Sequence, residues 1–287
     1  GPAGMACAAE AARRGYHVTL FEAAPTLGDQ FNLARVIPGK AEYGETVRYF
    51  TAELAHLGVT VRLGEPATAD ALAGYQAVVL ACGVRPRVPD LPGADHPCVV
   101  DYAQLLSGAV RVGRRVVILG AGGIGVDTAL FLALDGHHPD GPEFLREWGV
   151  DLNVTTPGGL RDALIEPAAR EIHLCWRSAG VPGQGLGLTT SWVHRAELER
   201  RGVHLHGNVR YLRVDDAGVH IEENGAVRVL PADHVVLCVG QEPQTALTEA
   251  LTARGVAVHT IGGARDAQGL NAVRAIAEGV AAAQAIR

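Results

Sequence analysis

Two glycine-rich segments constrain the fold of this chain more than any other feature. Gly1-Pro2-Ala3-Gly4 has the spacing of the last part of a G-x-G-x-x-G loop, and Gly120-Ala121-Gly122-Gly123-Ile124-Gly125 is a complete copy about 120 residues later. Such a loop joins a β-strand to a helix and lets the backbone approach the pyrophosphate of a dinucleotide. Two copies predict an α/β chain with two Rossmann-like domains that bind two nucleotide cofactors.

The composition fits this fold class and argues against several partners. The 287 residues are 48% hydrophobic and include 36 glycines, enough apolar side chains for two cores and enough glycine for many tight turns. A net charge of −6 argues against nucleic acid or an anionic membrane as a partner. The five cysteines form no C-x-x-C pair and no apolar run reaches about 18 residues, so we expect a reducing compartment and a cytoplasmic protein.

The first glycine segment is followed by the elements that a nucleotide site requires. Residues 3–14 predict a helix and residues 17–21 a buried strand that ends on Glu22, 18 residues after Gly4. An acidic residue at that spacing takes the ribose hydroxyls of a bound nucleotide. The alternative is a glycine-rich helix start with an ordinary surface glutamate. The strand that should precede the loop is missing, so we expect a chain beginning at Gly1 to bind its nucleotide weakly.

The second glycine segment has its own strand, residues 114–119, and helix, residues 126–134. An irregular Pro/Gly-rich insertion at about 135–170 delays the next strand, residues 171–176, which ends on Arg177 rather than on a carboxylate. A cation at this position pairs with a ribose 2′-phosphate, which favours NADPH over NADH. The alternative is that Arg177 is only a solvated surface charge.

An internal repeat and the end of the chain indicate two domains, one split by the other. Residues 76–86 and 234–243 each predict a buried strand ending in Gly-x-x-Pro, starting at Gly83 and Gly240. Residues 256–263 predict a strand and 270–287 a helix that return to the first domain. We therefore predict a split first domain and an inserted second one, with the limits 1–105 plus 244–287, and 106–243.

Further motifs resemble one family of flavoproteins along essentially the whole chain. The chain resembles the C-terminal half of bacterial NADPH-dependent 2,4-dienoyl-CoA reductases, which are two-dinucleotide-domain proteins related to old yellow enzyme and trimethylamine dehydrogenase. The motifs that carry the resemblance are Gln30-Phe31-Asn32, Ile37-Pro38-Gly39-Lys40, Glu147-Trp148-Gly149, Pro182 to Gly187 with Thr189-Thr190, and Trp192-x-His194-Arg195.

The resemblance implies an electron path from NADPH to FAD, then through a 4Fe-4S cluster and FMN to a TIM barrel that reduces an unsaturated fatty acyl-CoA. The barrel, cluster and FMN belong to an upstream part of such proteins, which would be this chain's partner. The implied FAD-binding residues are Gly1, Gly4, Glu22, Gln30, Gly83 and the Gly263 to Asp266 turn, and the implied NADPH-binding residues are Gly120, Gly122, Gly123, Gly125 and Arg177.

Three departures from the family pattern affect these sites. Asp29 stands where a second glycine precedes the glutamine, Arg265 displaces Asp266 by one position, and no lysines follow Arg177. Hydride transfer needs no protein nucleophile or base, so we predict no catalytic side chain, and the histidine spacing predicts no metal site.

Several interpretations remain open at this point. We interpret His194 and Arg195 as structural, and Gly183 to Gly187 as a lid near the nicotinamide rather than a plain exposed loop. The alternatives to a dienoyl-CoA reductase are the same module of an enoate reductase or amine dehydrogenase, or an inactive nucleotide-binding scaffold.

Overall fold

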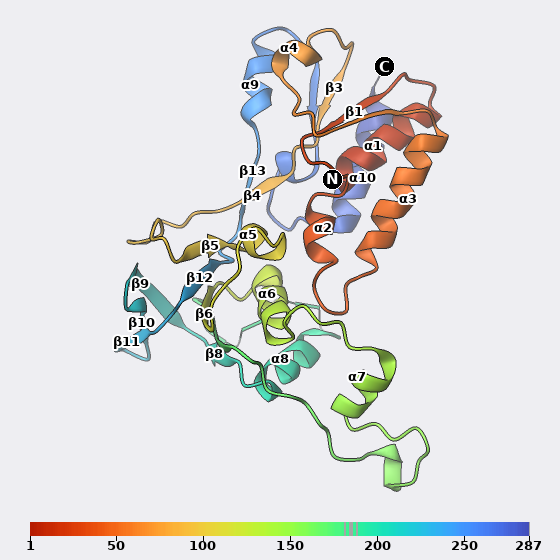
Figure 1. Ribbon diagram of the computed structural model, residues 1–287. Helices are drawn as coiled ribbons and strands as arrows, with labels where there is room; N and C mark the ends of the chain where they lie inside the picture. The colour runs from red at the N-terminus through yellow and green to blue at the C-terminus, as the bar shows by residue number, and fades with distance from the viewer. Residues whose placement is uncertain (181, 184–185, 188, 287) are drawn as a thin grey trace. The chain divides into compact units, whose positions relative to one another are not determined.

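The computed structural model describes residues 1–180, 182–183, 186–187 and 189–286, which divide into two units (Figure 1). The first unit comprises residues 1–35, 41–85 and 241–287, and the second comprises residues 36–40 and 86–240. The chain therefore passes from the first unit to the second and back twice.

The first unit is built on short parallel strand pairs covered by helices. Strand β1 (Thr19–Glu22) pairs in parallel with β2 (Thr60–Leu63), and β14 (Val258–Thr260) with β3 (Val78–Leu80). A further pair joins β13 (Gln241–Pro243) to β4 (Val84–Pro86). The helices are α1 (Pro2–Arg13), α2 (Gln30–Ala34), α3 (Tyr43–His56), α4 (Ala69–Leu72), α9 (Ala246–Thr252) and α10 (Ala272–Ala285), with a 3₁₀ turn η2 (Gly262–Ala264).

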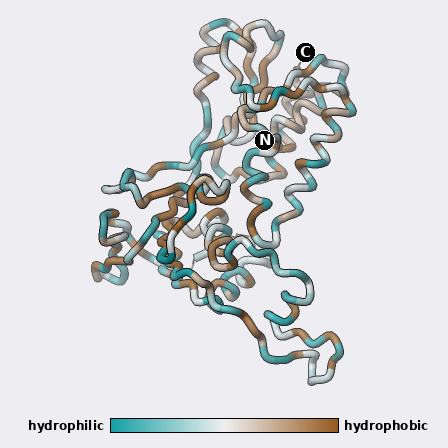
Figure 2. Tube along the Cα trace, in the orientation of Figure 1, coloured by the Kyte–Doolittle hydropathy of each residue, from teal (hydrophilic) through white to brown (hydrophobic). Residues whose placement is uncertain are grey.

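Small residues let α1 and α10 pack closely. Eight residues of α1 are buried, most of them alanine, and a Cβ added at Gly279 of α10 would lie only 2.3 Å from the carbonyl oxygen of Ala3. Helix α3 packs on the other side through Phe50 and Leu54, and Figure 2 shows the resulting alternation of hydrophobic and hydrophilic residues along it. The periodic apolar face is therefore what fixes α3 to α1.

The second unit contains a five-stranded, all-parallel sheet. Its strand order is β5-β12-β6-β7-β8, and each neighbouring pair is parallel. Strand β6 is central and its residues 116–119 are fully buried, as expected for a strand covered on both faces. The strands are β5 (Val99–Asp101), β6 (Arg115–Leu119), β7 (Glu171–Cys175), β8 (His204–His206) and β12 (His234–Leu237).

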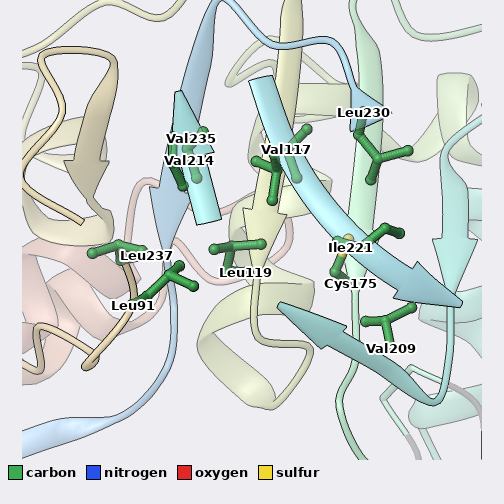
Figure 3. Close-up of a cluster of buried hydrophobic side chains, with 11 residues drawn as sticks. Leu91, Val117, Leu119, Cys175, Val209, Val214, Ile221, Leu230, Val235 and Leu237 are labelled. Atoms are coloured by element: carbon green, nitrogen blue, oxygen red, sulfur yellow. The ribbon is translucent and has the colours of Figure 1, made fainter. Parts of the chain in front are cut away.

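A three-stranded antiparallel sheet packs on this parallel sheet. It consists of β9 (Val209–Asp215), β10 (Gly218–Glu223) and β11 (Ala226–Leu230) in the order β11-β10-β9. Figure 3 shows side chains of both sheets meeting in one buried cluster, with Val117 and Leu237 from the parallel sheet opposite Ile221 from the antiparallel one. The two sheets thus share a single core.

Helices and one short segment complete the second unit. Helices α5 (Tyr102–Leu106), α6 (Gly123–Ala133), α7 (Gly141–Glu147) and α8 (Ser191–Arg200) belong to it, with a 3₁₀ turn η1 (Pro157–Gly159). The segment 36–40 joins this unit because Ile37 is buried and Lys40 Nζ lies 2.6 Å from Asp127 Oδ2 on α6.

Residues 86–105, which the sequence assigned to the first domain, contribute β5 and α5 to the second unit because β5 pairs with β12. Apart from this segment, the domain limits predicted from the sequence remain a prediction.

The insertion 135–170 is not wholly irregular, which corrects the expectation from its Pro/Gly content. Helix α7 forms there because the Asp140 side chain accepts a hydrogen bond from the Glu143 N–H and Pro142 fits the first helical turn. Helix α6 begins three residues earlier than predicted because Gly123 already has helical backbone angles. Strand β14 is shorter than predicted, since the chain turns into η2 at Gly262.

The α/β class with parallel, Rossmann-like sheets is confirmed. Among the described residues, no helix combines the length and apolarity that a membrane span requires.

Candidate nucleotide-binding sites

The first glycine segment forms the start of α1. Gly1 is the N-cap of the helix, and Gly4 lies one turn along it. A Cβ at Gly4 would lie 3.2 Å from Cβ of Ala81 and 3.7 Å from Leu20, so glycine here allows α1 to lie close to the ends of β1 and β3. The helix begins with free N–H groups and the positive end of its dipole, which together attract an anion.

Glu22 ends β1, as the sequence predicts. Its Oε1 accepts a hydrogen bond from the backbone N–H of Ala24 at 3.0 Å, and the side chain is only partly buried. The hydrogen bond fixes one carboxylate oxygen, and the other, Oε2, lies 3.6 Å from the backbone nitrogen of Gly1. A carboxylate held in this way can accept hydrogen bonds from ribose hydroxyls.

Gly83, Gly263 and Gln30 are three further residues that the sequence predicts for the site of the first unit. Gly83 follows β3 with φ of +72°, and a Cβ at Gly263 would lie 2.6 Å from Val84 and 3.1 Å from the carbonyl carbon of Gly83. Gln30 begins α2, and its Oε1 accepts a hydrogen bond from Gln241 at 3.4 Å. The structure therefore brings Gly83 and Gly263 into contact.

Asp266 lies in an exposed turn and its contacts are local. Its Oδ1 accepts a hydrogen bond from the Gln268 N–H at 2.8 Å, and its Oδ2 lies 3.8 Å from Arg274. The neighbouring Glu278 carboxylate accepts hydrogen bonds from Gly262 N–H and Arg265, both at 2.6 Å, and so holds the η2 turn.

Asp29 is the feature of this site that sequence reasoning noted only as a departure. Its backbone has φ of +45° and ψ of −116°, and its Oδ2 lies 3.0 Å from the position that a Cβ at Gly83 would take. Burial raises the pKa of the Asp29 carboxyl, and the nearby Glu22 carboxylate acts in the same direction. An acidic side chain therefore lies beside both Gly83 and Gly1 of the first unit.

The second glycine segment links β6 to α6. Gly120 has φ of +103°, Gly122 is the N-cap of α6, and Gly123 starts the helix. A Cβ at Gly125 would lie 1.8 Å from the Gly120 carbonyl oxygen, so this position accepts only glycine. Among the described residues, no atom lies within 4 Å of a Cβ at Gly122, which leaves its backbone open to a ligand on this side.

Tyr211 of β9 contacts this loop, and sequence reasoning missed it. Its hydroxyl accepts a hydrogen bond from the Gly120 N–H at 3.1 Å and donates one to the Cys175 carbonyl at 2.9 Å. Burial raises the pKa of Tyr211, so the hydroxyl keeps its proton for this bond. Strand β9 lies about 90 residues after the loop in sequence, and no local signal marks the contact.

Arg177 lies beyond the end of β7, beside the strand that carries the glycine loop. Its side chain is exposed, and the guanidinium carbon lies 6.0 Å from the centre of the Tyr211 ring. An exposed cation at this strand end is available to an anionic ligand. The structure thus brings Gly120 and Arg177 together through Tyr211.

The described ends of the predicted lid also contact the loop. Gly183 donates a backbone hydrogen bond to Ala121 at 3.0 Å, and Leu186 lies 3.6 Å from a Cβ at Gly123. Residues 184 and 185 of the predicted lid lie outside the described residues. On α8, Arg195 pairs with Glu199 at 4.0 Å, and the buried His194 Nδ1 has no hydrogen-bond partner in the described part of the chain.

Histidines of β7 and β8 lie close together elsewhere in the second unit. His173 Nδ1 lies 2.9 Å from His206 Nε2, and His206 Nδ1 lies 2.9 Å from Glu223. Burial lowers the pKa of His173. Within the described ranges, no group of three or more His, Cys, Asp or Glu side chains has the geometry to hold a metal ion.

Comparison with known proteins gives one family and several relatives. The sequence profile of the family described as pyridine nucleotide-disulphide oxidoreductase matches residues 1–273. The chain is 30% identical over 270 residues to a metal reductase of Desulforamulus reducens, covering 92% of this chain and 40% of that protein. It is also 30% identical over 289 residues to a bilirubin reductase of Mediterraneibacter gnavus, covering 100% of this chain and 40% of that protein.

One solved structure is similar over the whole chain. A 2-naphthoyl-CoA reductase in complex with 2-naphthoyl-CoA superimposes with a TM-score of 0.84 and 26% identity, covering 100% of this chain and 39% of that one. The chain therefore spans about 40% of the length of the curated relatives that it matches.

Proposed function

This chain belongs to the pyridine nucleotide-disulphide oxidoreductase family, and from that membership we propose that it is the NADPH-oxidising, FAD-carrying module of a larger oxidoreductase. The observation that carries the proposal is the presence of one glycine segment in each unit, each at the start of a helix that follows or packs against parallel strands. One site would hold FAD and the other NADPH.

The residues of the first unit fit FAD in most respects. The N-terminus of α1 with Gly1 and Gly4 offers N–H groups to a pyrophosphate, and Glu22 offers a carboxylate oxygen to a ribose. Gln30 and Gly83 would line the same ligand, with the Gly263 to Asp266 turn on its ribityl side. FAD, when bound, supplies a ring that accepts a hydride, which no amino-acid side chain can do.

The second unit would bind NADPH. Gly120, Gly122, Gly123 and Gly125 form the loop against which the pyrophosphate would lie, and Tyr211 holds the first of them. Arg177 would pair with the 2′-phosphate, as a charge-assisted hydrogen bond. These residues act by binding and orienting the nicotinamide, and we assign no side chain to proton transfer.

The electron acceptor beyond FAD belongs to the larger protein. The three similar proteins are named for a metal, for bilirubin and for 2-naphthoyl-CoA, although this region aligns at 26 to 30% identity in all of them. A region shared by enzymes with different substrates supports a shared step, which is nucleotide oxidation. We further propose that the electrons pass to an upstream 4Fe-4S cluster and FMN in a barrel that reduces an unsaturated acyl-CoA, as in 2,4-dienoyl-CoA reductases.

Anaerobic stopped-flow absorbance tests this proposal. The full-length protein is loaded with FAD, mixed with NADPH or NADH, and followed at the flavin band. We expect fast bleaching by NADPH, and a loss of about tenfold or more in NADPH affinity in Arg177→Ala, because a charge-assisted pair is removed. Arg146→Ala is the matched control, since Arg146 is an exposed arginine on α7.

Each outcome has a clear meaning. Bleaching by NADPH that weakens only in Arg177→Ala supports the reductase module and its coenzyme preference. FAD binding without bleaching by either coenzyme would favour an inactive scaffold. Reduction of the flavin by an amine, which gives up two electrons as it is oxidised, without NADPH oxidation by a conjugated acyl-CoA, would favour the amine dehydrogenase alternative.

A further inference from the structure

The side chain of Asp29 lies beside Gly1 and Gly83, two of the residues that the proposed function assigns to the first nucleotide site. A Cβ added at Gly83 would lie 3.0 Å from Asp29 Oδ2, and a Cβ added at Gly1 would lie 3.3 Å from the same oxygen. Gly1 and Gly83 belong to segments that are far apart in sequence and meet at this carboxylate. Glycines at such positions are required where a backbone must approach a phosphate closely.

The backbone of Asp29 supports a specific role for its side chain. A φ of +45° with ψ of −116° is a region that side chains other than glycine rarely adopt. Asp29 is also the N-cap of α2, where its carboxylate makes no capping hydrogen bond and instead interacts with the backbone and side chain of the adjacent Gln30. Aspartate is favoured at N-caps because it makes that bond. The carboxylate thus lies beside Gly1 and Gly83 without making the capping bond that usually accounts for an aspartate at an N-cap.

The electrostatics of the position oppose an anionic ligand. The N-terminus of α1 attracts a pyrophosphate, whereas a carboxylate a few ångströms away repels it. Glu22 adds a second carboxylate to the same site, and burial makes the ionised form of Asp29 costly. A bound pyrophosphate would bring further negative charge to a carboxylate that already has the Glu22 carboxylate nearby.

We propose that Asp29 sets the affinity of the first nucleotide site by opposing the pyrophosphate of FAD, so that the cofactor binds weakly and exchanges reversibly. This inference rests on the proposed function, in which the first site takes FAD. It makes Asp29 a residue that lowers the affinity of the first site, in contrast to the residues that favour binding.

Two substitutions of Asp29 separate its charge from its backbone conformation. Asp29→Asn removes the charge and keeps the shape, and Asp29→Gly removes the charge and also relieves the backbone. Asp162→Asn is the matched control, because Asp162 is an exposed aspartate of the second unit and its loss changes the net charge equally. The dissociation constant for FAD is measured by flavin fluorescence on the deflavinated full-length protein.

The ligands ADP and adenosine distinguish repulsion from a general structural effect. We expect Asp29→Asn to bind FAD and ADP tighter than wild type by about tenfold or more, since one like-charge contact is removed. Adenosine carries no phosphate, so its affinity should be the same in both proteins. A change of equal size for adenosine would overturn the electrostatic role.

The remaining outcomes separate this inference from the proposed function. Equal FAD affinity in wild type and Asp29→Asn would overturn the inference alone and leave the FAD site in place. Failure of wild type and all variants to bind FAD would overturn both. The proposal is supported if Asp29→Gly binds FAD at least as tightly as Asp29→Asn does, and if Asp162→Asn has the FAD affinity of wild type.

Discussion

Replacing Gly125 by alanine tests how the second glycine loop is built. The new Cβ would lie 1.8 Å from the Gly120 carbonyl oxygen and 2.8 Å from its carbon. Because carbon and oxygen atoms approach to about 3.3 Å at closest, the start of α6 and the end of β6 must separate by roughly 1.5 Å. The neighbouring Leu119 and Val126 are buried, so this shift disturbs the core of the second unit.

The expected loss of stability follows from two opposing effects. Overpacking of a close contact costs about 1–3 kcal/mol, and backbone atoms give way less than side chains, which favours the upper end. Alanine in a helix gains back about 1 kcal/mol relative to glycine. We expect a net loss of about 2 kcal/mol, which corresponds to a decrease in Tm of roughly 4–8 °C for a unit of this size.

Gly122→Ala is the matched control within the same loop. No atom of the described residues lies within 4 Å of a Cβ at Gly122, so its Tm should fall much less than that of Gly125→Ala, by no more than the loss of glycine at an N-cap costs. Its affinity for NADPH should nevertheless fall, because the Cβ takes the space through which the backbone approaches a pyrophosphate. Thermal denaturation without nucleotide and NADPH titration measure the two effects. A wild-type Tm for Gly125→Ala, or an equal loss of stability in both variants, would refute this reasoning.

Three further substitutions or conditions test other contacts of the second unit. Tyr211→Phe should weaken NADPH binding several-fold even though Arg177 is still present, because Gly120 loses one hydrogen bond. An unaltered dissociation constant for NADPH in a fluorescence titration would contradict this. Arg201→Leu should lower the free energy of unfolding in urea by about 3–5 kcal/mol, since it leaves the buried Glu147 carboxylate, 2.8 Å away, without its cation. Burial lowers the pKa of His173 in the folded state, so the unfolded state binds the proton more readily. The free energy of unfolding should therefore fall as the pH drops below about 6.5. In urea denaturation at a series of pH values, His173→Gln should flatten this part of the profile.

The local elements were largely predictable from the sequence. The helices after both glycine segments, the strand ending on Glu22 and the strand before Arg177 all lie where the pattern of apolar residues and glycines places them. Each of these features depends on residues that are neighbours in sequence. Helix α7 was missed because Pro/Gly content was given more weight than the capping signal of Asp140.

The assembly of the site was less predictable. The sequence marks Asp29 as an unusual residue before Gln30, but the approach of its carboxylate to Gly83 depends on where β3 ends in space. Likewise, Tyr211 reaches Gly120 only because the antiparallel sheet that carries it packs on the parallel sheet.

The sequence by itself determined the periodicity and the turns of this protein, and hence its class, its two glycine segments and the strand ends that carry Glu22 and Arg177. The contacts of Asp29 and Tyr211 needed the tertiary structure. The physical reason is that backbone conformation responds mainly to adjacent residues, whereas a contact between distant segments depends on the packing of every element that lies between them.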